Sequence, residues 1–499
     1  MLKFKIIFCL LLPIVAFSQN EKWPAQKLKQ DLSIFREIRQ KANSGVYKYR
    51  TKKQIDSIYT WAFSQLQEPK ELLDFYKIIL KITDFEGSLH NDTTLPDEFE
   101  NQYSSGKVFF PYPVKLINSK IVVNFKNNEI PLGSQIYSIN GIDSDKIVQS
   151  FYKYYTTDGF NISGKSIGIN NSFGKYFRME YGPQEHFSIV YSLPNETQKL
   201  SKSISSVTNE TRKENFKNRY SLPFDSLQYQ RAKNKYSFKV LSPSTALLSI
   251  HTFLIGMHAK DKEHLAYKKY LDSCFQFLSQ HHDIKNVIVD IRNNGGGTDP
   301  NDIITYSYLT QKPYRENSAA YVNFQKIPFP NYFVYEETEP KKQLEERNDF
   351  EADLKEEFPA FKGTQYPQDT KFNLLVQPDK NSFKGQIYLL ISPRIASAGS
   401  LFASLVAGNT NAIIIGEETM GGYYGHNGHT PVEYELPNTK IKTQFSIVNL
   451  DQDVPKKPNQ IFGRGIIPDH QVEQTFDDFM QNKDTQFDYT LALIKEKQP

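Results

Sequence analysis

The chain has 499 residues with a formal net charge of +4, and 39% of them are hydrophobic and 14% aromatic. This length and this apolar content suffice for packed cores, suggest about three domains, and exclude an intrinsically disordered chain. Because Lys, Arg, Asp and Glu are interleaved and nearly balanced, the charge pattern argues against a dedicated nucleic-acid-binding surface.

The first 18 residues have the pattern of a secretory signal peptide. They contain two lysines, an apolar run from Ile6 to Phe17, and a small residue, Ser18, at the expected cleavage point. The run is short for a membrane-spanning helix, although a retained anchor is the alternative. Removal of this segment with Cys9 would leave only Cys274, so that no internal disulfide could form. We therefore expect a bacterial periplasmic or secreted protein.

The region from residue 19 to residue 100 is predicted to be helical. Between residues 24 and 85, apolar side chains recur every three or four positions, as on the buried face of an amphipathic helix. The polar run Asn43-Ser44-Gly45 should separate the first helix from the second. We expect these apolar stripes to form core packing rather than a cofactor site.

Residues 101–155 change to short strands and contain the string PLGSQIYSINGIDSDKIVQSF. This string resembles the G-x-x-I-x-x-I-N-G segment of a PDZ-like module, with Ser144 as the cap of the following helix. The resemblance implies a β-rich module that binds an extended peptide at a sheet edge. A plain β-hairpin domain without peptide affinity is the alternative. Residues 156–235 are polar and are interpreted as an insertion or linker.

Residues 236–495 are predicted to form the core of the protein, beginning with a strand at 246–253 and a helix at 264–279. Within this core, residues 310–381 are rich in Pro, Tyr, Lys and Glu. We interpret them as a charged cap or lid over a cleft, with a solvated surface insertion as the alternative.

Three consecutive glycines, Gly295–Gly297, follow an apolar strand in the segment NVIVDIRNNGGGTDPND. Glycine readily adopts positive φ, so this bend can point bare N–H groups into a cleft. Two N–H groups aimed at one point stabilise a developing oxyanion, which is a large effect in acyl transfer. The alternative is an ordinary flexible turn.

One serine, Ser397, lies between a second apolar strand (387–391) and a helical apolar pattern. The start of a helix carries a partial positive charge that stabilises a nearby anion. Its small neighbours, Ala396, Ala398 and Gly399, would let a substrate backbone approach closely. Ser397 could therefore act as a nucleophile; an ordinary helix N-cap is the alternative.

In this order, VIVDIRNNGGG, RIASAG, IIIGEETMGG and GRGIIPDHQV resemble the C-terminal-processing and tricorn-core serine peptidase family, which includes tail-specific proteases. The resemblance covers residues 236–495 and, more loosely, the chain back to about residue 30. It implies an α/β fold with a spiral core like that of crotonase and the Clp peptidase. It also implies that Ser397 is the nucleophile and that N–H groups of Ala398 and of Gly295 or Gly296 form the oxyanion hole.

Two further turns match the family pattern: a site-shaping turn with Glu417, Thr419 and Gly421, and a closing element, expected to be structural, with Gly465, Pro468 and Asp469. Family members with a serine–lysine dyad carry their lysine just after the first of these turns. Here no lysine follows before Lys440. Because a serine hydroxyl needs a nearby base, the base must come from elsewhere.

His90 is the predicted general base. The branch of the family that resembles the tricorn core uses a histidine at the end of an upstream helical region, and His90 follows the apolar stretch IILKITDF. A pKa near neutrality would suit this role, whereas a surface loop position is the alternative. His426 and His429, where the dyad lysine would lie, are the other candidates. They could instead line the cleft or bind a metal, but two histidines without a nearby Cys or carboxylate are a weak metal signal.

A third catalytic group stays unassigned. The histidine-using branch of the family carries a carboxylate shortly before the closing element, and this chain has Gln460 and Phe462 there. Glu433, Asp451 and Asp453 are the acidic residues that could take its place, and the sequence does not rank them.

The sequence therefore predicts an exported serine-type peptidase that hydrolyses peptide bonds through an acyl-enzyme, with peptides or proteins as substrates and without a cofactor. A catalytically inactive peptide- or lipophile-binding protein on the same fold is the alternative, because the lysine and the glutamate of relatives are missing. Acyl transfer or hydrolysis on a non-peptide substrate is a third possibility.

Overall fold

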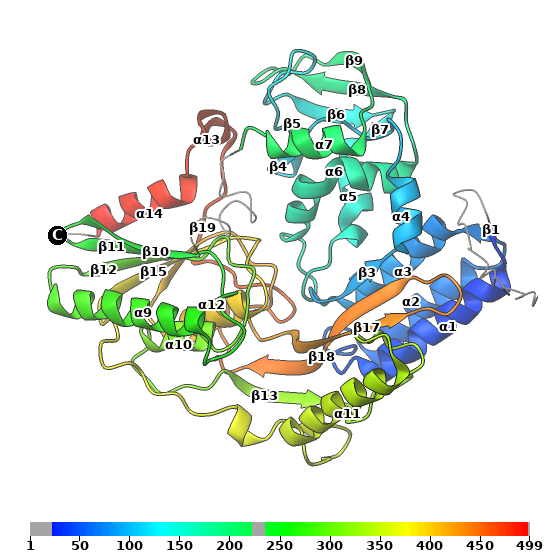
Figure 1. Cartoon of the computed structure of the whole chain (residues 1–499). Coiled ribbons are helices and arrows are strands. Elements are labelled where there is room, and N and C mark those ends of the chain that lie inside the picture. The colour runs from blue at the N-terminus through cyan, green and yellow to red at the C-terminus, as the bar shows by residue number, and fades with distance from the viewer. Residues whose placement is uncertain (1–21, 222–234, 498–499) are drawn as a thin grey trace, which may run out of the picture.

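The computed structural model describes residues 22–221 and 235–497 of the chain. The predicted signal peptide, with Cys9 and Ser18, lies outside these residues. Within them, no helix combines the length and the apolarity needed to cross a bilayer. The described residues form an N-terminal helical region, a β-rich module and a core with two sheets (Figure 1).

Three amphipathic helices follow one another near the N-terminus, as the apolar repeats predict: α1 (Ala25–Ala42), α2 (Lys52–Ser64) and α3 (Leu72–Glu86). α1 ends before Asn43, the first residue of the expected break. α2 begins with a capping box in which Thr51 and Gln54 each accept a backbone N–H of the other. α3 ends at Gly87, whose left-handed conformation (φ 76°) turns the chain toward His90.

A buried ion pair joins α1 to α3. Arg39 and Glu86 have side chains that are 0% and 1% exposed, and the Nε of Arg39 lies 3.0 Å from Oε2 of Glu86. Arg39 also donates to Oδ1 of Asn91, which directly follows His90 in the chain. A buried charge needs such partners because its desolvation is costly. The pair thereby ties the helices to the loop that carries His90.

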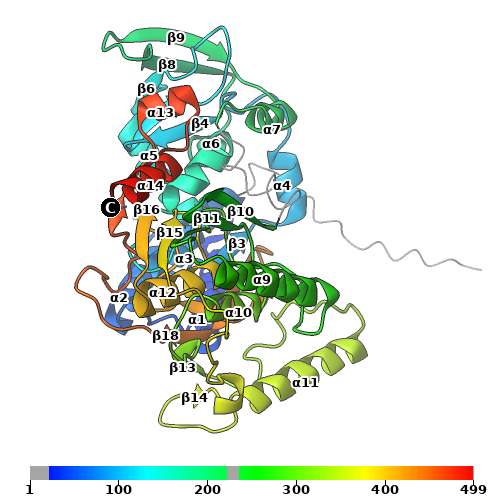
Figure 2. The same ribbon diagram turned by 90° about the vertical axis from the view of Figure 1, so that its left-hand side faces the viewer.

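The β-rich module lies at the top of both views (Figures 1 and 2) and contains a sheet of strand order β4-β5-β6-β8-β9, with β7 paired to β6. Its strands are β4 (Val114–Ile117), β5 (Lys120–Val123), β6 (Gln135–Ile139), β7 (Ile142–Asp143), β8 (His186–Ser192) and β9 (Leu200–Ser205). Its helices include α5 (Ser144–Phe151), α6 (Lys165–Tyr181) and α7 (Asn209–Lys217). The cap of α5 is Asp143, one position before the expected Ser144.

The predicted boundary between residues 155 and 156 does not divide the module. β8 pairs with β6, and β9 pairs with β8, so residues beyond 156 complete the sheet. Phe187 and Ile189 alternate with exposed neighbours and are buried in the core of the module. Over its described residues, the stretch 156–235 is therefore part of the module rather than a linker.

The first core sheet has the order β10-β11-β12-β15-β16-β19 and is parallel from β11 onward. Its strands are β10 (Tyr236–Ser242), β11 (Thr245–Ile250), β12 (Asn286–Asp290), β15 (Gln386–Ile391), β16 (Ile413–Gly416) and β19 (His470–Gln471). Helices cover both faces: α9 (Lys262–Gln280) and α12 (Ala398–Asn409) on one, α14 (Thr485–Glu496) on the other. Because β12 and β15 are adjacent and parallel, the motifs that follow them lie at the same edge.

The second core sheet has the order β14-β13-β18-β17, with β3 paired to β18. Its strands are β3 (Asp92–Thr94), β13 (Asn317–Val322), β14 (Tyr366–Pro367), β17 (Asn427–Glu435) and β18 (Lys442–Gln452). The stretch 310–381 thus contributes two strands to a sheet, in addition to the charged helix α11 (Pro340–Glu357). α11 buries only Leu354 and lies at the end of the molecule opposite the β-rich module (Figure 2).

Candidate active site

Ser397 lies on a strained turn between β15 and α12. Its backbone has φ 51° and ψ −134°, a conformation that residues with a Cβ rarely adopt. Such strain costs about 1–3 kcal/mol and is frequent at functional sites. The Ser397 side chain makes no capping hydrogen bond to the helix that follows, so it does not serve as an ordinary N-cap. Its hydroxyl is therefore available at the positive end of α12.

The triple-glycine bend packs directly against Ser397. A Cβ built on Gly296 would lie 2.7 Å from the Cβ of Ser397 and 3.1 Å from the backbone nitrogen of Ala398. Gly296 has φ 101°, which residues with a side chain avoid. Two segments that are far apart in the sequence therefore meet at the edge of the parallel sheet, and glycine permits the close contact.

The N–H groups around this contact are not equivalent. The N–H of Gly296 donates to Oδ1 of Asn294 at 2.9 Å and is therefore already engaged. The N–H groups of Gly295 and Ala398 have no acceptor among the described residues. Of the two glycines that the sequence left open, the geometry favours Gly295 as an oxyanion donor, although this role stays a prediction.

His90 lies in the loop after α3, where its ring faces that of His426 at a centroid distance of 5.1 Å. The Nδ1 atoms of both rings are buried and have no hydrogen-bond partner among the described residues. Burial lowers the pKa of His90 to about 4, against an opposing contribution from the backbone of Asn427. The pKa of His90 is therefore lower than the near-neutral value that we expected from the sequence. Burial also lowers the pKa of His426, so both imidazoles are neutral at pH 7.

Asp158, which the sequence analysis missed, holds the His90 loop in place. Its Oδ1 accepts the N–H of Leu89 at 3.0 Å, and its Oδ2 accepts the N–H of Gly422 at 2.9 Å. Asp158 is fully buried, and this burial raises the pKa of its carboxyl to about 7 despite the two hydrogen bonds. An aspartate within a polar stretch carries no sequence signal for such a role, because the role depends on two distant loops.

The turn that contains Gly421 and Gly422 also contacts the Ser397 turn. The N–H of Gly421 donates to the carbonyl oxygen of Ile395 at 3.1 Å, two residues before Ser397. The loops that carry His90 and Ser397 therefore share this turn as a common neighbour.

The closing element is bound tightly to the same turn. A Cβ on Gly465 would lie 1.8 Å from the carbonyl oxygen of Thr419, and Oγ1 of Thr419 accepts the N–H of Ile466 at 2.9 Å. Asp469 accepts the N–H of Ile414 at 2.9 Å and so connects the element to β16. These contacts are structural, as the sequence led us to expect.

Among the described residues, no contact assigns a third catalytic group from Glu433, Asp451 and Asp453. In the structure, Asp451 pairs with Lys48 at 2.7 Å, and Glu433 lies 3.8 Å from Lys442. Both carboxylates are thus engaged with lysines at the surface of the second core sheet.

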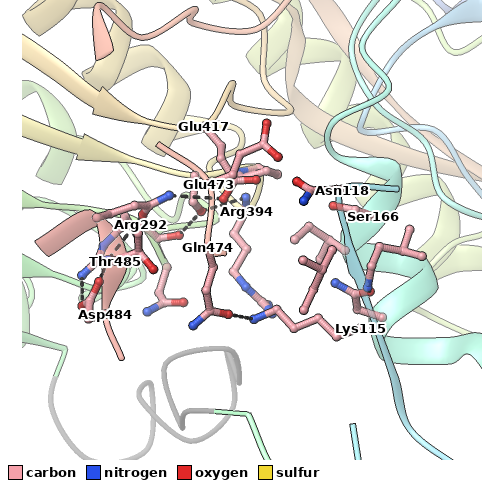
Figure 3. Close-up of a pocket in the computed structure, with 18 of the residues that line it drawn as sticks. Lys115, Asn118, Ser166, Arg292, Arg394, Glu417, Glu473, Gln474, Asp484 and Thr485 are labelled. Carbon is pink, nitrogen blue, oxygen red and sulfur yellow. Dashed lines mark hydrogen bonds and ion pairs between the residues drawn. The ribbon is translucent and has the colours of Figure 1, made fainter. Parts of the chain in front are cut away.

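A cavity of about 120 Å³ lies where the β-rich module meets the carboxyl ends of the core strands (Figure 3). Lys115 comes from the module, whereas Arg292 and Asn293 follow β12, Arg394 follows β15 and Glu417 follows β16. Asn293 and Arg394 belong to the same loops as the glycine bend and the candidate serine. The cavity therefore adjoins the loops of the candidate site, although Ser397, the glycine bend and His90 are not among the residues that line it.

Residues 244–472 match the model of peptidase family S41. Among solved structures, mature CPAF is similar to the chain with a TM-score of 0.57 and 13% identity over 95% of this chain and 99% of that one. A CPAF mutant gives a TM-score of 0.62 with 13% identity, covering 94% and 96%, and CPAF complexed with lactacystin gives 0.56 with 13%, covering 94% and 98%. No curated protein matches the sequence.

At this identity the likeness to CPAF shows the fold alone, and it confirms the predicted mixed α/β class. The finer expectations, a spiral core and a PDZ-like module, stay predictions. The family match includes β11, β12, the glycine bend, Ser397 and the closing element. Residues 244–472 are therefore similar to peptidase family S41, and the chain has a mixed α/β fold like that of CPAF.

Proposed function

We propose that the protein is an exported serine-type peptidase with Ser397 as its nucleophile. The observation that carries this proposal is the contact between the glycine bend and a strained, uncapped serine at the start of α12. The family match over the same segments supports it.

In the proposed reaction, Oγ of Ser397 attacks the carbonyl carbon of a peptide bond while His90 accepts the hydroxyl proton. The oxyanion of the tetrahedral intermediate accepts the free N–H groups of Ala398 and Gly295. His90 then returns the proton to the leaving amine, which leaves an acyl-enzyme. Water, deprotonated by the same imidazole, attacks the ester; the bond to Oγ of Ser397 breaks, and the imidazolium returns the proton to this oxygen as the acid leaves.

The substrate in this proposal is an extended peptide or protein segment. The cavity between the β-rich module and the strand ends of the core adjoins both candidate loops and is lined by charged side chains from each part. An open sheet edge in the module would offer backbone hydrogen bonds to such a segment. This arrangement suits a peptide better than a compact small molecule.

The test is labelling by a fluorophosphonate, which reacts with activated serines, together with cleavage of a peptide library. Ser397→Ala should abolish both while the protein still folds. Ser404→Ala is the matched control, because Ser404 lies in the same helix, is fully buried and has no hydrogen-bond partner among the described residues. A wild-type protein that stays unlabelled would instead favour the inactive peptide-binding alternative.

His90 is tested by the pH dependence of labelling. Because only the neutral imidazole accepts a proton, and the pKa of His90 is about 4, the rate should hold down to about pH 5 and fall below it. A midpoint near the ordinary histidine value of 6.5 would assign the base to a different group. His90→Ala should suppress labelling more than His426→Ala; the reverse order would make His426 the base.

A further inference from the structure

A second cavity, of about 480 Å³, lies where α3 and β3 meet the β-rich module (Figure 1). Its walls come from α3, from the loop that carries His90, from residues 153–156 of the module and from the turn that contains Met420. The volume falls within the range of about 300–1,000 Å³ that is usual for ligand pockets. We call it the His90 cavity because His90 forms part of its wall, whereas no candidate catalytic residue lines the cavity of Figure 3.

The position of His90 relates this cavity to the proposed reaction, on which the present inference rests. In that reaction the imidazole takes the proton of Ser397 and gives it to the leaving amine, so it must lie against the scissile bond. Met420 connects the cavity to the serine turn, because the N–H of the next residue, Gly421, donates to the carbonyl oxygen of Ile395. A substrate side chain in the His90 cavity would therefore belong to a residue at or next to the scissile bond.

The inner wall of the His90 cavity is apolar or already hydrogen-bonded. Leu80 and Met420 are buried and contribute apolar side chains. The hydroxyl groups of Tyr76 and Thr156 donate to backbone carbonyl oxygens of the segment that follows His90, at 2.6 and 2.8 Å. Because these donors are engaged, the inner wall favours hydrocarbon over a further polar group.

The mouth of the cavity carries an uncompensated negative charge. Asp92 of β3 and Gln444 of β18 are paired in register, and they are the two exposed residues of the lining. Among the described residues no Lys, Arg or His forms an ion pair with Asp92, whose Oδ1 accepts only the N–H of Thr93, at 2.8 Å. Lys153, the cation of the lining, lies 2.7 Å from the carboxylate of Glu180, so its charge is neutralised.

We propose that the His90 cavity binds a lysine or arginine side chain of the substrate and that Asp92 determines this specificity. The aliphatic stem would pack against the inner wall while the charged end reaches the mouth, as long basic side chains commonly do. At the mouth the cation forms a charge-assisted hydrogen bond with the carboxylate of Asp92. Tyr76, Tyr154 and Tyr155 also line the cavity, and aromatic rings attract cations. A glutamate side chain would instead be repelled by Asp92.

The experiment measures the binding of fluorescent peptide pools to Ser397→Ala, a variant that should bind substrate without cleaving it. Each pool has one fixed residue (Lys, Met or Glu) between randomised uncharged flanks, and fluorescence anisotropy gives its affinity. The Lys pool should bind roughly three- to tenfold more tightly than the Glu pool, because an ion pair at an exposed mouth is partly screened. The net charge of +4 would favour the Glu pool if the attraction were non-specific.

Asp92→Asn removes the charge but keeps an oxygen that can accept the N–H of Thr93. Added to Ser397→Ala, it should abolish the difference between the Lys and Glu pools and leave the affinity for the Met pool unchanged. The matched control is Asp349→Asn, which changes an exposed aspartate of α11 and should preserve the difference. A merely structural role for Asp92 would lower all three affinities together, and that result would refute the proposal.

Fluorophosphonate labelling of the wild type keeps this inference separate from the proposed function, since the probe reports on the activated serine and does not require the cavity. A labelled wild type whose Ser397→Ala form binds the Lys and Glu pools equally would overturn the specificity and leave the peptidase proposal in place. An unlabelled wild type with Asp92-dependent binding of the Lys pool would support the cavity as a binding site and count against the peptidase.

Discussion

Gly296→Ala is the substitution that tests the proposed site most directly. The new Cβ would lie 2.7 Å from the Cβ of Ser397, 3.0 Å from the carbonyl oxygen of Ala396 and 3.1 Å from the nitrogen of Ala398. Ordinary contact of a Cβ begins at 3.4 Å, so the serine turn or the glycine bend must move by about 0.7 Å. The three atoms that would be displaced include those that we assign to nucleophile and oxyanion hole.

Two effects add in this variant. A left-handed backbone at a residue with a Cβ costs about 1–2 kcal/mol, and overpacking adds about 1–3 kcal/mol. Because a displacement of about 1 Å in catalytic groups can reduce a rate about a hundredfold, the labelling rate should fall roughly 10- to 100-fold. The loss of activity should thus appear in folded protein as well as in a lower unfolding temperature.

Gly141→Ala separates the two effects. Gly141 has φ 76° but no atom within 4 Å of a built Cβ, so it has the backbone cost without the collision. The assay compares the unfolding temperature and the fluorophosphonate labelling rate of the two variants with wild type. Gly141→Ala should label at the wild-type rate. If Gly296→Ala also labels at that rate and is no less stable than Gly141→Ala, the close contact with Ser397 does not exist and the site is wrong.

Two further predictions concern buried charges. Arg39→Met leaves Glu86 buried without its cation and should lower the free energy of unfolding by about 3–5 kcal/mol in urea denaturation. Lys52→Met, which breaks the exposed pair with Asp56, should lower the stability much less, because water and salt screen exposed charges. Equal losses of stability in the two variants would contradict this reasoning. Because the pKa of Asp158 is raised from 3.8 to about 7, its carboxyl stays protonated in the native state over a pH range in which it is ionised in the unfolded chain. The free energy of unfolding should therefore fall as pH rises through this range, by up to about 4 kcal/mol. In Asp158→Asn this component of the pH slope should be absent, and an unchanged slope between pH 4 and pH 7 would show that Asp158 titrates normally.

Local chemistry explains which parts of the molecule the sequence predicted well. The amphipathic repeats predicted α1 to α3, since a stripe of apolar residues must be buried. The apolar runs before the glycine bend and before Ser397 predicted β12 and β15. β12 and β15 are neighbouring parallel strands, so the loops that follow them lie at the same edge of the sheet. The contact between Gly296 and Ser397 could therefore be predicted from the sequence.

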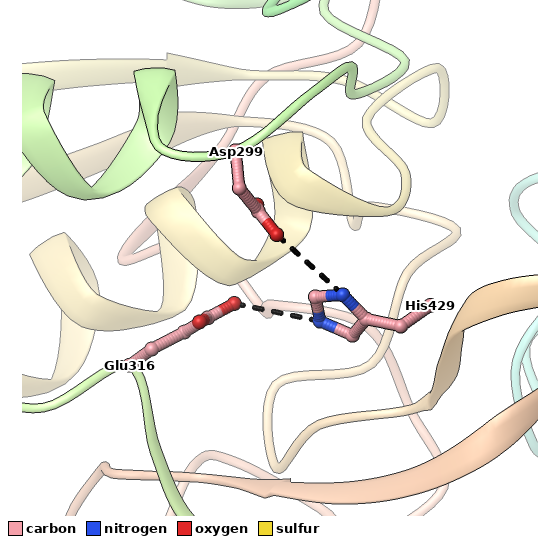
Figure 4. Close-up of side chains that lie close together, drawn as sticks. All are labelled: Asp299, Glu316 and His429. Carbon is pink, nitrogen blue, oxygen red and sulfur yellow. Dashed lines mark ion pairs between the residues drawn. The ribbon is translucent and has the colours of Figure 1, made fainter. Parts of the chain in front are cut away.

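Tertiary structure decided the properties that depend on burial and on contacts between distant segments. The pKa of His90 is lowered by surroundings that no neighbour in the chain reveals. Asp158 acts through hydrogen bonds from two loops that are distant in the sequence, one to each of its carboxylate oxygens. His429 has no carboxylate close to it in the sequence, and only folding brings Asp299 and Glu316 next to it (Figure 4). The extent of the β-rich module followed from the pairing of β8 with β6. Residue type and local spacing are present in the sequence, whereas desolvation and long-range pairing arise only when the chain is packed.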